Sequence, residues 1–171
     1  MNNNSLANDA SSYILGWVLA CGNKAPMYAT IINVSKEFGL DQNEVANTIN
    51  KLINTKYINT CSVGRIVKDD VNVYIGIGAD RSWIGSNQQA QTFKDMIDKE
   101  LHLCGLKIIQ TLMTTSGSTP SSLMEAIKEH CGGTVLVAID KALENNVIRL
   151  GDRGELHIAE KGLRIYIGIG K

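Results

Sequence analysis

Apolar residues recur at helical spacing in three successive segments of the first half of the chain. Residues 13–21 form an apolar run, while residues 30–38 and 42–54 each place their apolar side chains on one face. This spacing is typical of helices that bury one side in a core. Gly39 stands where the second helix would end, and Asp41 where the third would be capped. The pattern therefore predicts three helices with a tight turn between the last two.

Two strands are expected directly after the third helix. Apolar and polar side chains alternate through residues 57–61 and again through residues 71–77, as they do in half-buried strands. Between them, residues 62–70 hold a glycine and several charges, which is the composition of a loop. The resulting order of helices, strands and charged loop is that of a winged-helix domain.

Residues 31–52 carry a resemblance to a known class of protein. They read Ile-x-x-Val-Ser-x-x-Phe-Gly-Leu-x-x-x-x-Val-x-x-x-Ile-x-x-Leu, which resembles the helix-turn-helix core of bacterial transcriptional regulators. The Lys-Tyr-Ile at residues 56–58 resembles the exit from that core into the wing. The resemblance covers residues 13–77 and is one of apolar spacing. It implies a winged-helix regulator of a bacterium or a mobile element, with double-stranded DNA as its partner.

The second half of the chain follows a similar order. A first helix is expected over residues 106–113, a second from Thr119 and Pro120, and a third over residues 134–144. Residues 148–158 then form a hairpin whose turn, residues 151–154, begins and ends with glycine.

Two matches between the halves indicate an internal repeat. The pentapeptide Tyr-Ile-Gly-Ile-Gly occurs at residues 74–78 and again at residues 166–170. Residues 49–58 align without a gap on residues 139–148, and their apolar positions coincide. Residues 159–162 resemble the start of a fourth helix found in many winged helices, but apolar residues alternate through residues 163–169, so a strand like residues 71–77 is expected there.

The fold class predicted is α+β, with two winged-helix domains in tandem joined by a connecting helix. Apolar residues at helical spacing across residues 87–101, without Gly or Pro, predict that helix. The boundaries follow from these elements: a polar N-terminal tail at residues 1–11, domains at 12–79 and 104–171, and the connecting helix at 80–103.

Composition adds three limits. Seventeen basic and seventeen acidic residues give a net charge of zero, so any DNA-binding charge must be local. Neither a secretory signal nor a membrane-spanning run is evident, which favours a cytoplasmic protein without membrane contact. The four cysteines, at 21, 61, 104 and 131, form no CxxC pair and are expected to be reduced thiols. Together with the three histidines they match no usual zinc spacing, so no metal and no cofactor are expected.

Polar side chains outside the apolar stripe of the third helix are the candidates for base contacts. Asn and Gln can each pair bidentately with adenine in the major groove. Basic residues at the helix ends and in the wings would meet phosphates. Residues 24–68 hold six basic residues against three acidic ones, so this region is locally positive. The candidate DNA-binding residues are Gln42, Asn43, Asn47, Asn50, Lys51, Lys56, Arg65, Lys68, Arg149 and Arg153.

The third helix of the second unit has almost no polar face. Leu136 and Val137 occupy the positions of Ala46 and Asn47 in the first unit, which is unfavourable for reading bases. We expect this face to be buried in an interface, with twofold pairing into a homodimer as the main expectation. Coverage by the connecting helix within one chain is the alternative.

No nucleotide-binding loop or catalytic constellation is present in the sequence, so the chain is expected not to be an enzyme. The function favoured is transcriptional regulation through DNA binding, with the first domain reading the major groove. Two alternatives remain. One is a protein-interaction adaptor, similar in layout to tandem winged-helix subunits of condensin-type and ESCRT-type complexes, with a protein partner on the second domain. The other is replication or partition of a mobile element.

Overall fold

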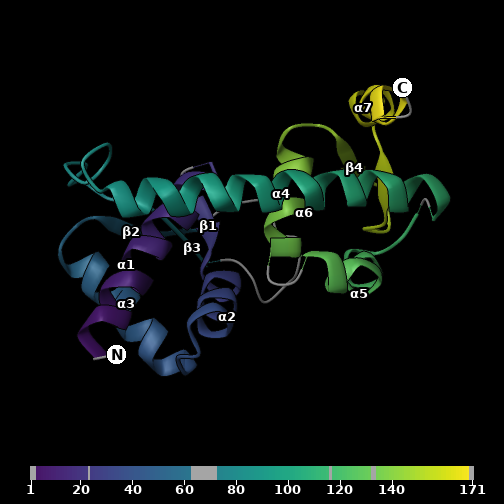
Figure 1. Cartoon of the computed structure of the whole chain (residues 1–171). Helices are drawn as coiled ribbons and strands as arrows, with labels where there is room; N and C mark the ends of the chain where they lie inside the picture. The colour runs from purple at the N-terminus through teal and green to yellow at the C-terminus, as the bar shows by residue number, and fades with distance from the viewer. Residues whose placement is uncertain (1–2, 23, 63–72, 116, 132–133, 170–171) are drawn as a thin grey trace. The chain divides into compact units, whose positions relative to one another are not determined.

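In the computed structural model the chain forms two compact units (Figure 1). Unit 1 comprises Met1–Lys99 and unit 2 comprises Glu100–Lys171. Both contain helices and small antiparallel sheets, so the α+β class is confirmed. The residues described are 3–22, 24–62, 73–115, 117–131 and 134–169.

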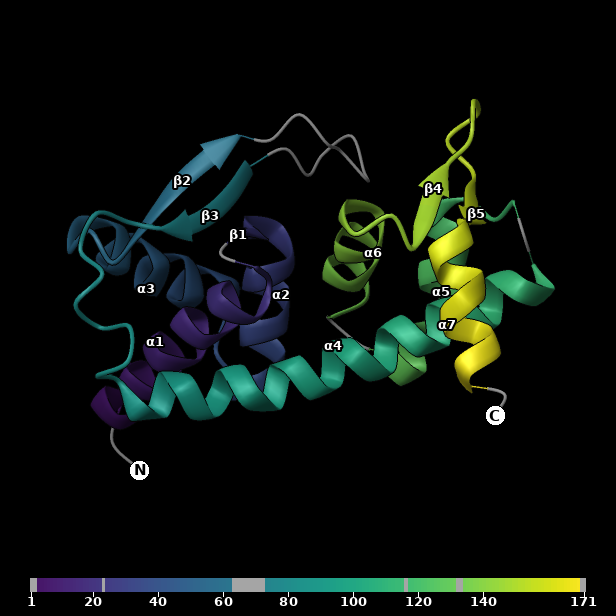
Figure 2. The ribbon, with the colours of Figure 1, turned by 90° about the horizontal axis from the view of Figure 1, so that it is seen from above.

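Unit 1 combines three helices with a three-stranded antiparallel sheet of order β1-β3-β2. The central strand pairs Lys24–Pro26 on one side and Ile58–Ser62 on the other. Figure 2 shows the helices on one face of this sheet. In chain order the elements are α1 (Asn3–Ala20), β1 (Lys24–Pro26), α2 (Met27–Phe38), α3 (Gln42–Asn54), β2 (Ile58–Ser62) and β3 (Val73–Ile77). The first helix begins within the stretch that the sequence suggested as a polar tail.

The turn between α2 and α3 has the predicted capping residues. Gly39 adopts φ 65°, a left-handed conformation that glycine enters without steric cost. Ser35 Oγ donates a hydrogen bond to the carbonyl oxygen of Leu40 at 2.5 Å, closing the turn. The carboxylate of Asp41 accepts from the backbone N–H of Glu44 at 2.8 Å and so caps α3. The angle between α2 and α3 therefore rests on local hydrogen bonds as well as on the core.

An aromatic cluster packs α1, α2 and the first part of α4 (Gln88–Thr114) together in unit 1. The ring of Tyr13 lies 5.4 Å from that of Phe38 and 5.2 Å from that of Phe93, in edge-to-face geometry. The Tyr13 hydroxyl accepts a buried hydrogen bond from Asn33 Nδ2 at 2.8 Å. Gly16 allows the close approach of α1 to α4, since a Cβ there would lie 2.5 Å from the carbonyl oxygen of Ala90.

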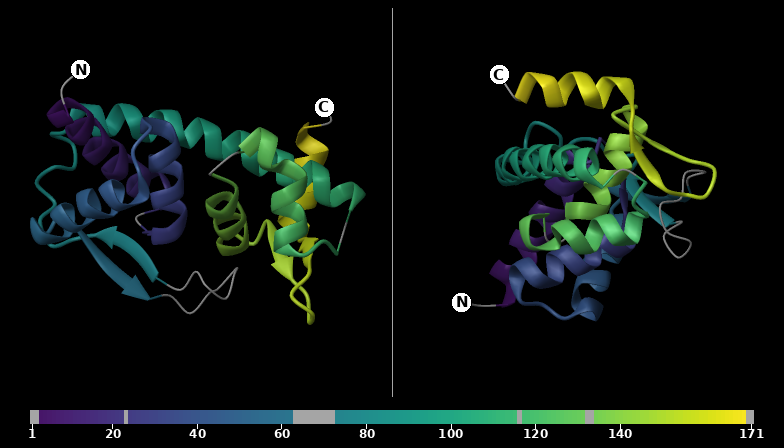
Figure 3. Two further views of the ribbon diagram at one scale, coloured as in Figure 1. Left: turned by 90° about the horizontal axis from the view of Figure 1, so that it is seen from below. Right: turned by 90° about the vertical axis from the view of Figure 1, so that its right-hand side faces the viewer.

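Unit 2 contains the second part of α4, three further helices and a short hairpin. The counterpart of β1 is reduced in this unit to a single β-bridge between Ser118 and Leu156. Figure 3 shows the hairpin extending from the helical part of the unit. After α4 the elements are α5 (Pro120–Cys131), α6 (Val135–Glu144), β4 (Ile148–Leu150), β5 (Leu156–Ile158) and α7 (Glu160–Ile169). Because α4 is one continuous helix, the separate helix expected over residues 106–113 is its last part.

The strand predicted over residues 163–169 is wrong, because these residues lie in α7. The pentapeptide Tyr-Ile-Gly-Ile-Gly therefore spans most of β3 in unit 1, whereas in unit 2 its described part, residues 166–169, is helical. In unit 2 the place beside β4 is already taken by β5, whose Ile158 pairs with Ile148. The ion pair between Arg164 and Glu160, one turn apart at 2.7 Å, is compatible only with the helix. The same pentapeptide thus adopts different structures in the two units, because in unit 2 the preceding strand β5 already pairs with β4.

The second match between the halves is reproduced in the backbone. After α3, the N–H of Lys56 bonds to the carbonyl of Ile53, and after α6 the N–H of Asn146 bonds to that of Leu143. Both Lys56 and Asn146 have positive φ, at 67° and 60°, which is uncommon outside glycine. The two helix-to-strand turns, ninety residues apart, are thus the same structure.

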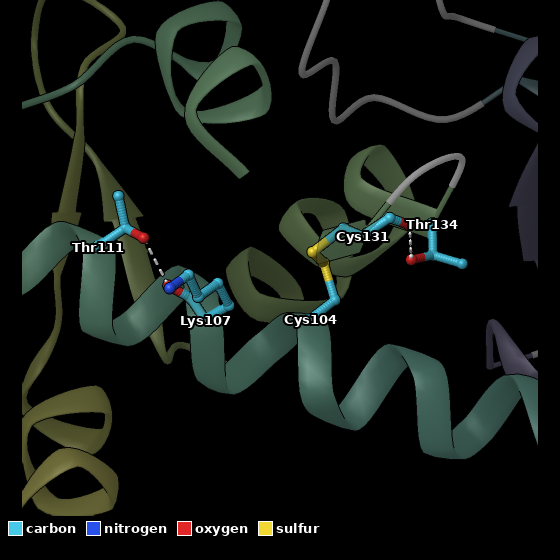
Figure 4. Close-up of a disulfide and its surroundings, with 5 residues drawn as sticks. All are labelled: Cys104, Lys107, Thr111, Cys131 and Thr134. Atoms are coloured by element: carbon cyan, nitrogen blue, oxygen red, sulfur yellow. Dashed lines mark hydrogen bonds between the residues drawn. A yellow bond between two sulfur atoms is a disulfide. The ribbon is translucent and has the colours of Figure 1, made fainter. Parts of the chain in front are cut away.

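Two of the four cysteines form a disulfide, which corrects the expectation that all are reduced. Cys104 on α4 is joined to Cys131 at the end of α5, with their Cα atoms 5.3 Å apart (Figure 4). Next to the disulfide, the hydroxyl of Thr134 donates a hydrogen bond to the carbonyl of Cys131 at 2.6 Å. Cys21 and Cys61 are not disulfide-bonded. The sequence did not signal the pair, because its members are 27 residues apart and no CxxC motif marks them.

Candidate nucleic-acid interface

The third helix of unit 1 has one buried and one polar face. Val45, Ile49 and Leu52 are buried against the rest of the unit, together with Thr48, whose hydroxyl donates to the carbonyl of Glu44 at 3.0 Å. This placement follows from the apolar residues at three- and four-residue intervals, which align on one side of a helix. Ala46 and Ile53 are half-buried, and the other side chains of α3 are exposed.

All five residues of α3 proposed for base contacts are exposed. They are, in order, Gln42, Asn43, Asn47, Asn50 and Lys51. Asn47 and Asn50 are one turn apart and therefore lie on the same side of the helix. Four amides and one ammonium group form a surface that can both donate and accept hydrogen bonds, which base edges in a major groove require.

Lys56 is exposed and follows α3 directly, at the turn that leads into β2. Its positive φ is fixed by the hydrogen bonds of the turn. Lys51 and Lys56 form no ion pair with another described residue. The other two basic residues proposed for this unit, Arg65 and Lys68, lie outside the described residues.

Tyr28 is an exposed aromatic residue that was not among the site residues predicted from the sequence. It lies at the start of α2, where its side chain is 53% exposed, the highest value among the large apolar residues of unit 1. The sequence pattern predicted a helix over residues 30–38 only, so Tyr28 was given no place in it. The signal available was Pro26, which precedes the helix and whose carbonyl accepts from the Thr30 hydroxyl at 2.8 Å.

In unit 2, Arg149 and Arg153 are exposed on the hairpin. Between the strands, Glu155 accepts from the backbone N–H of Arg153 at 2.9 Å and lies 3.3 Å from the ring of His157. A hydrogen bond from its own backbone N–H, helped by His157 and the Arg153 amide, holds the pKa of the Glu155 carboxyl below its usual value. An ionised carboxylate thus lies on the same hairpin as the two arginines and is bonded to the backbone of one of them.

The interface predicted at Leu136 and Val137 is corrected for Val137. Its side chain is buried, with 3% exposed, and Val135 and Ile139 beside it are buried as well. Val137 is therefore not available to a second chain. The side chain of Leu136 lies outside the described part of the structure. Burial on several sides of α6 also means that this helix does not offer bases a polar face like that of α3.

No cluster of three or more metal-ligating side chains occurs among the residues that the structure describes. Among the helices that the structure describes, none is long and apolar enough to cross a membrane. No protein family, curated protein or solved structure shows a match to this chain.

Proposed function

We propose that this chain is a DNA-binding transcriptional regulator whose two units are winged helices. In unit 1, α3 would enter the major groove. The observation that carries the proposal is the exposed amide-rich face of α3, held by the capped turn that follows α2. A helix presented in this way is the reading element of helix-turn-helix proteins.

The topology of each unit supports a winged-helix assignment. In unit 1 the strand that precedes α2 pairs with β3, giving the order β1-β3-β2. In unit 2 the Ser118 bridge occupies the place of β1, so that β5 has neighbours on both sides, as β3 does. Both units use the same turn after the third helix. Three features with the same order in two halves of one chain favour a common plan.

The third helices of the two units differ, so the two units would contact DNA differently. Unit 1 would supply base contacts from Asn47 and Asn50 and phosphate contacts from Lys51 and Lys56. Unit 2, whose α6 is largely buried, would contact phosphates through Arg149 and Arg153 alone. The net charge of zero makes such contacts few, so affinity would depend on base reading more than on charge. Action on chromosomal DNA would place the protein in the cytoplasm, where disulfides such as Cys104–Cys131 are uncommon.

The test is selection from random-sequence duplex DNA at a stated salt concentration, followed by binding to the enriched site. We expect Asn47→Ala and Asn50→Ala each to reduce discrimination between the enriched and a scrambled duplex by about 1–3 kcal/mol. Lys51→Ala should weaken binding to both duplexes alike and reduce the magnitude of the slope of log affinity against log salt by about 1. Asn145→Ala, an exposed asparagine of unit 2 outside the proposed contacts, is the matched control.

A protein-interaction adaptor is the competing function, and one observation favours it. The chain is electrically neutral, whereas proteins held on DNA by a broad positive surface are basic. Absence of any enriched sequence, together with no binding to duplex DNA even at low salt, would refute DNA binding. Asn47→Ala and Asn50→Ala that weaken all duplexes equally would refute base reading by α3.

A further inference from the structure

Exposed apolar side chains gather on one face of α4. Leu103 is 65% exposed, more than any other large apolar residue described, and Met96 and Met113 are 46% and 39% exposed. Leu106, between them, is half-buried. An exposed leucine by itself is ordinary, but four large apolar side chains aligned on one helix are a feature of helices that pair.

The spacing of these four residues is that of a heptad seam. Met96, Leu103, Leu106 and Met113 are separated by seven, three and seven positions, so they occupy a and d positions of successive heptads. The buried side of the helix is a different one. It is formed by Ile97, Leu101, Cys104, Ile108 and Leu112. The exposed seam is therefore additional to the face that α4 uses for the cores.

We propose that α4 pairs in antiparallel orientation with α4 of a second copy of this chain. With the twofold axis beside residues 104 and 105, Leu103 faces the partner's Leu106, and Met96 faces the partner's Met113. The symmetry repeats each layer, so that all four apolar residues are covered in both copies. This proposal concerns assembly and stands whether or not the chain binds DNA.

Polar residues on the same helix are complementary in this register. Lys99 and Gln110 occupy the remaining two seam positions, and the register places Lys99 opposite the partner's Gln110. On the flank, Glu100 comes next to the partner's Lys107, and the symmetry makes this opposite-charge pair twice. In a parallel pair, Lys99 would instead face the partner's Lys99. The charges thus favour the antiparallel arrangement, and a second copy fits the surface because the surface complements itself.

The experiment is sedimentation equilibrium of the full chain and of charge-swap variants. Glu100→Lys and Lys107→Glu each place like charges opposite one another at two sites, so each should raise the dimer dissociation constant about tenfold or more. The double variant Glu100→Lys/Lys107→Glu restores opposite charges, and its dissociation constant should return toward that of the wild type. Recovery in the double variant cannot come from misfolding, which two substitutions would deepen.

A second pair of variants tests the seam itself. Leu103→Lys should give a monomer, whereas Leu163→Lys, an exposed leucine of α7 with 42% exposure, should leave the dimer intact. A wild type that remains monomeric at high micromolar concentration overturns the proposal. So does a dimer that persists unchanged in Leu103→Lys, or a double charge swap that fails to recover what the single variants lose.

Discussion

Reduction of the disulfide should destabilise unit 2 by about 3.5 kcal/mol. Cys104 and Cys131 are 27 residues apart, and a cross-link restricts the unfolded chain more as the closed loop lengthens. The chain-entropy relation gives about 3 kcal/mol for a loop of 15 residues and about 4.7 for one of 100, which brackets this case. For a unit near 70 residues, such a loss is a large fraction of the total stability.

The two tryptophans make the effect measurable by unit. Trp17 and Trp83 both lie in unit 1, so tryptophan emission follows the unfolding of that unit, while circular dichroism follows the helices of both. In urea, a phosphine reductant should move part of the dichroism transition lower by roughly 2.3–3.5 M, given a slope of about 1–1.5 kcal/mol/M. The emission transition should move much less.

Cys61→Ser is the control, because that residue is outside the disulfide and half-buried. The oxidised variant should unfold like the oxidised wild type. Thiol titration of the wild type in denaturant without reductant should find two reactive thiols per chain, Cys21 and Cys61. Four thiols in that titration, or dichroism curves that coincide with and without reductant, would show that the cross-link does not stabilise unit 2.

Three further outcomes are expected. Gly16→Ala should lower the free energy of unfolding by about 1–3 kcal/mol, because its Cβ would meet the backbone of α4. Gly105→Ala has open space around it and should raise the free energy of unfolding by about 0.5–1 kcal/mol. Urea unfolding curves measure both changes. Asp41→Ala should cost about 1 kcal/mol by removing the cap of α3, seen as a lower melting temperature. Because folding lowers the pKa of Glu155, its contribution is present above the ordinary value of 4.5 and lost as the pH falls below it, so Glu155→Gln should flatten the acid limb of the melting profile.

The sequence was most informative where structure is local. The turn at Gly39, the cap at Asp41 and the exposed face of α3 depend on residues within a few positions of one another, and all three were predicted. The two helix-to-strand turns were likewise found through their alignment. Spacing and capping chemistry are sufficient for such features, because the backbone geometry of a helix relates neighbouring positions directly.

Features that depend on distant partners were missed. Residues 163–169 alternate like a strand, but β5 already fills the place beside β4, and no local pattern reveals that competition. Cys104 and Cys131 meet only because α4 and the end of α5 pack together. Val137 was assigned to the outer face of its helix by analogy with Asn47, and only the packed unit shows that the position is buried. In each case the deciding contact lies outside the window that a sequence pattern covers.

The repeated pentapeptide also affects how the chain behaves when it is damaged. Tyr-Ile-Gly-Ile-Gly carries no charge and no proline, and its β-branched residues favour extended pairing. In unit 1 the segment is protected as the central strand, with Lys24 and Pro26 on one edge strand discouraging further pairing. In unit 2, Tyr166–Ile169 form the last turn of α7, where their backbone N–H groups donate to carbonyls within the helix. Partial unfolding of either unit would expose a segment that occurs twice in every chain, so strand pairing between chains would have two identical places at which to begin.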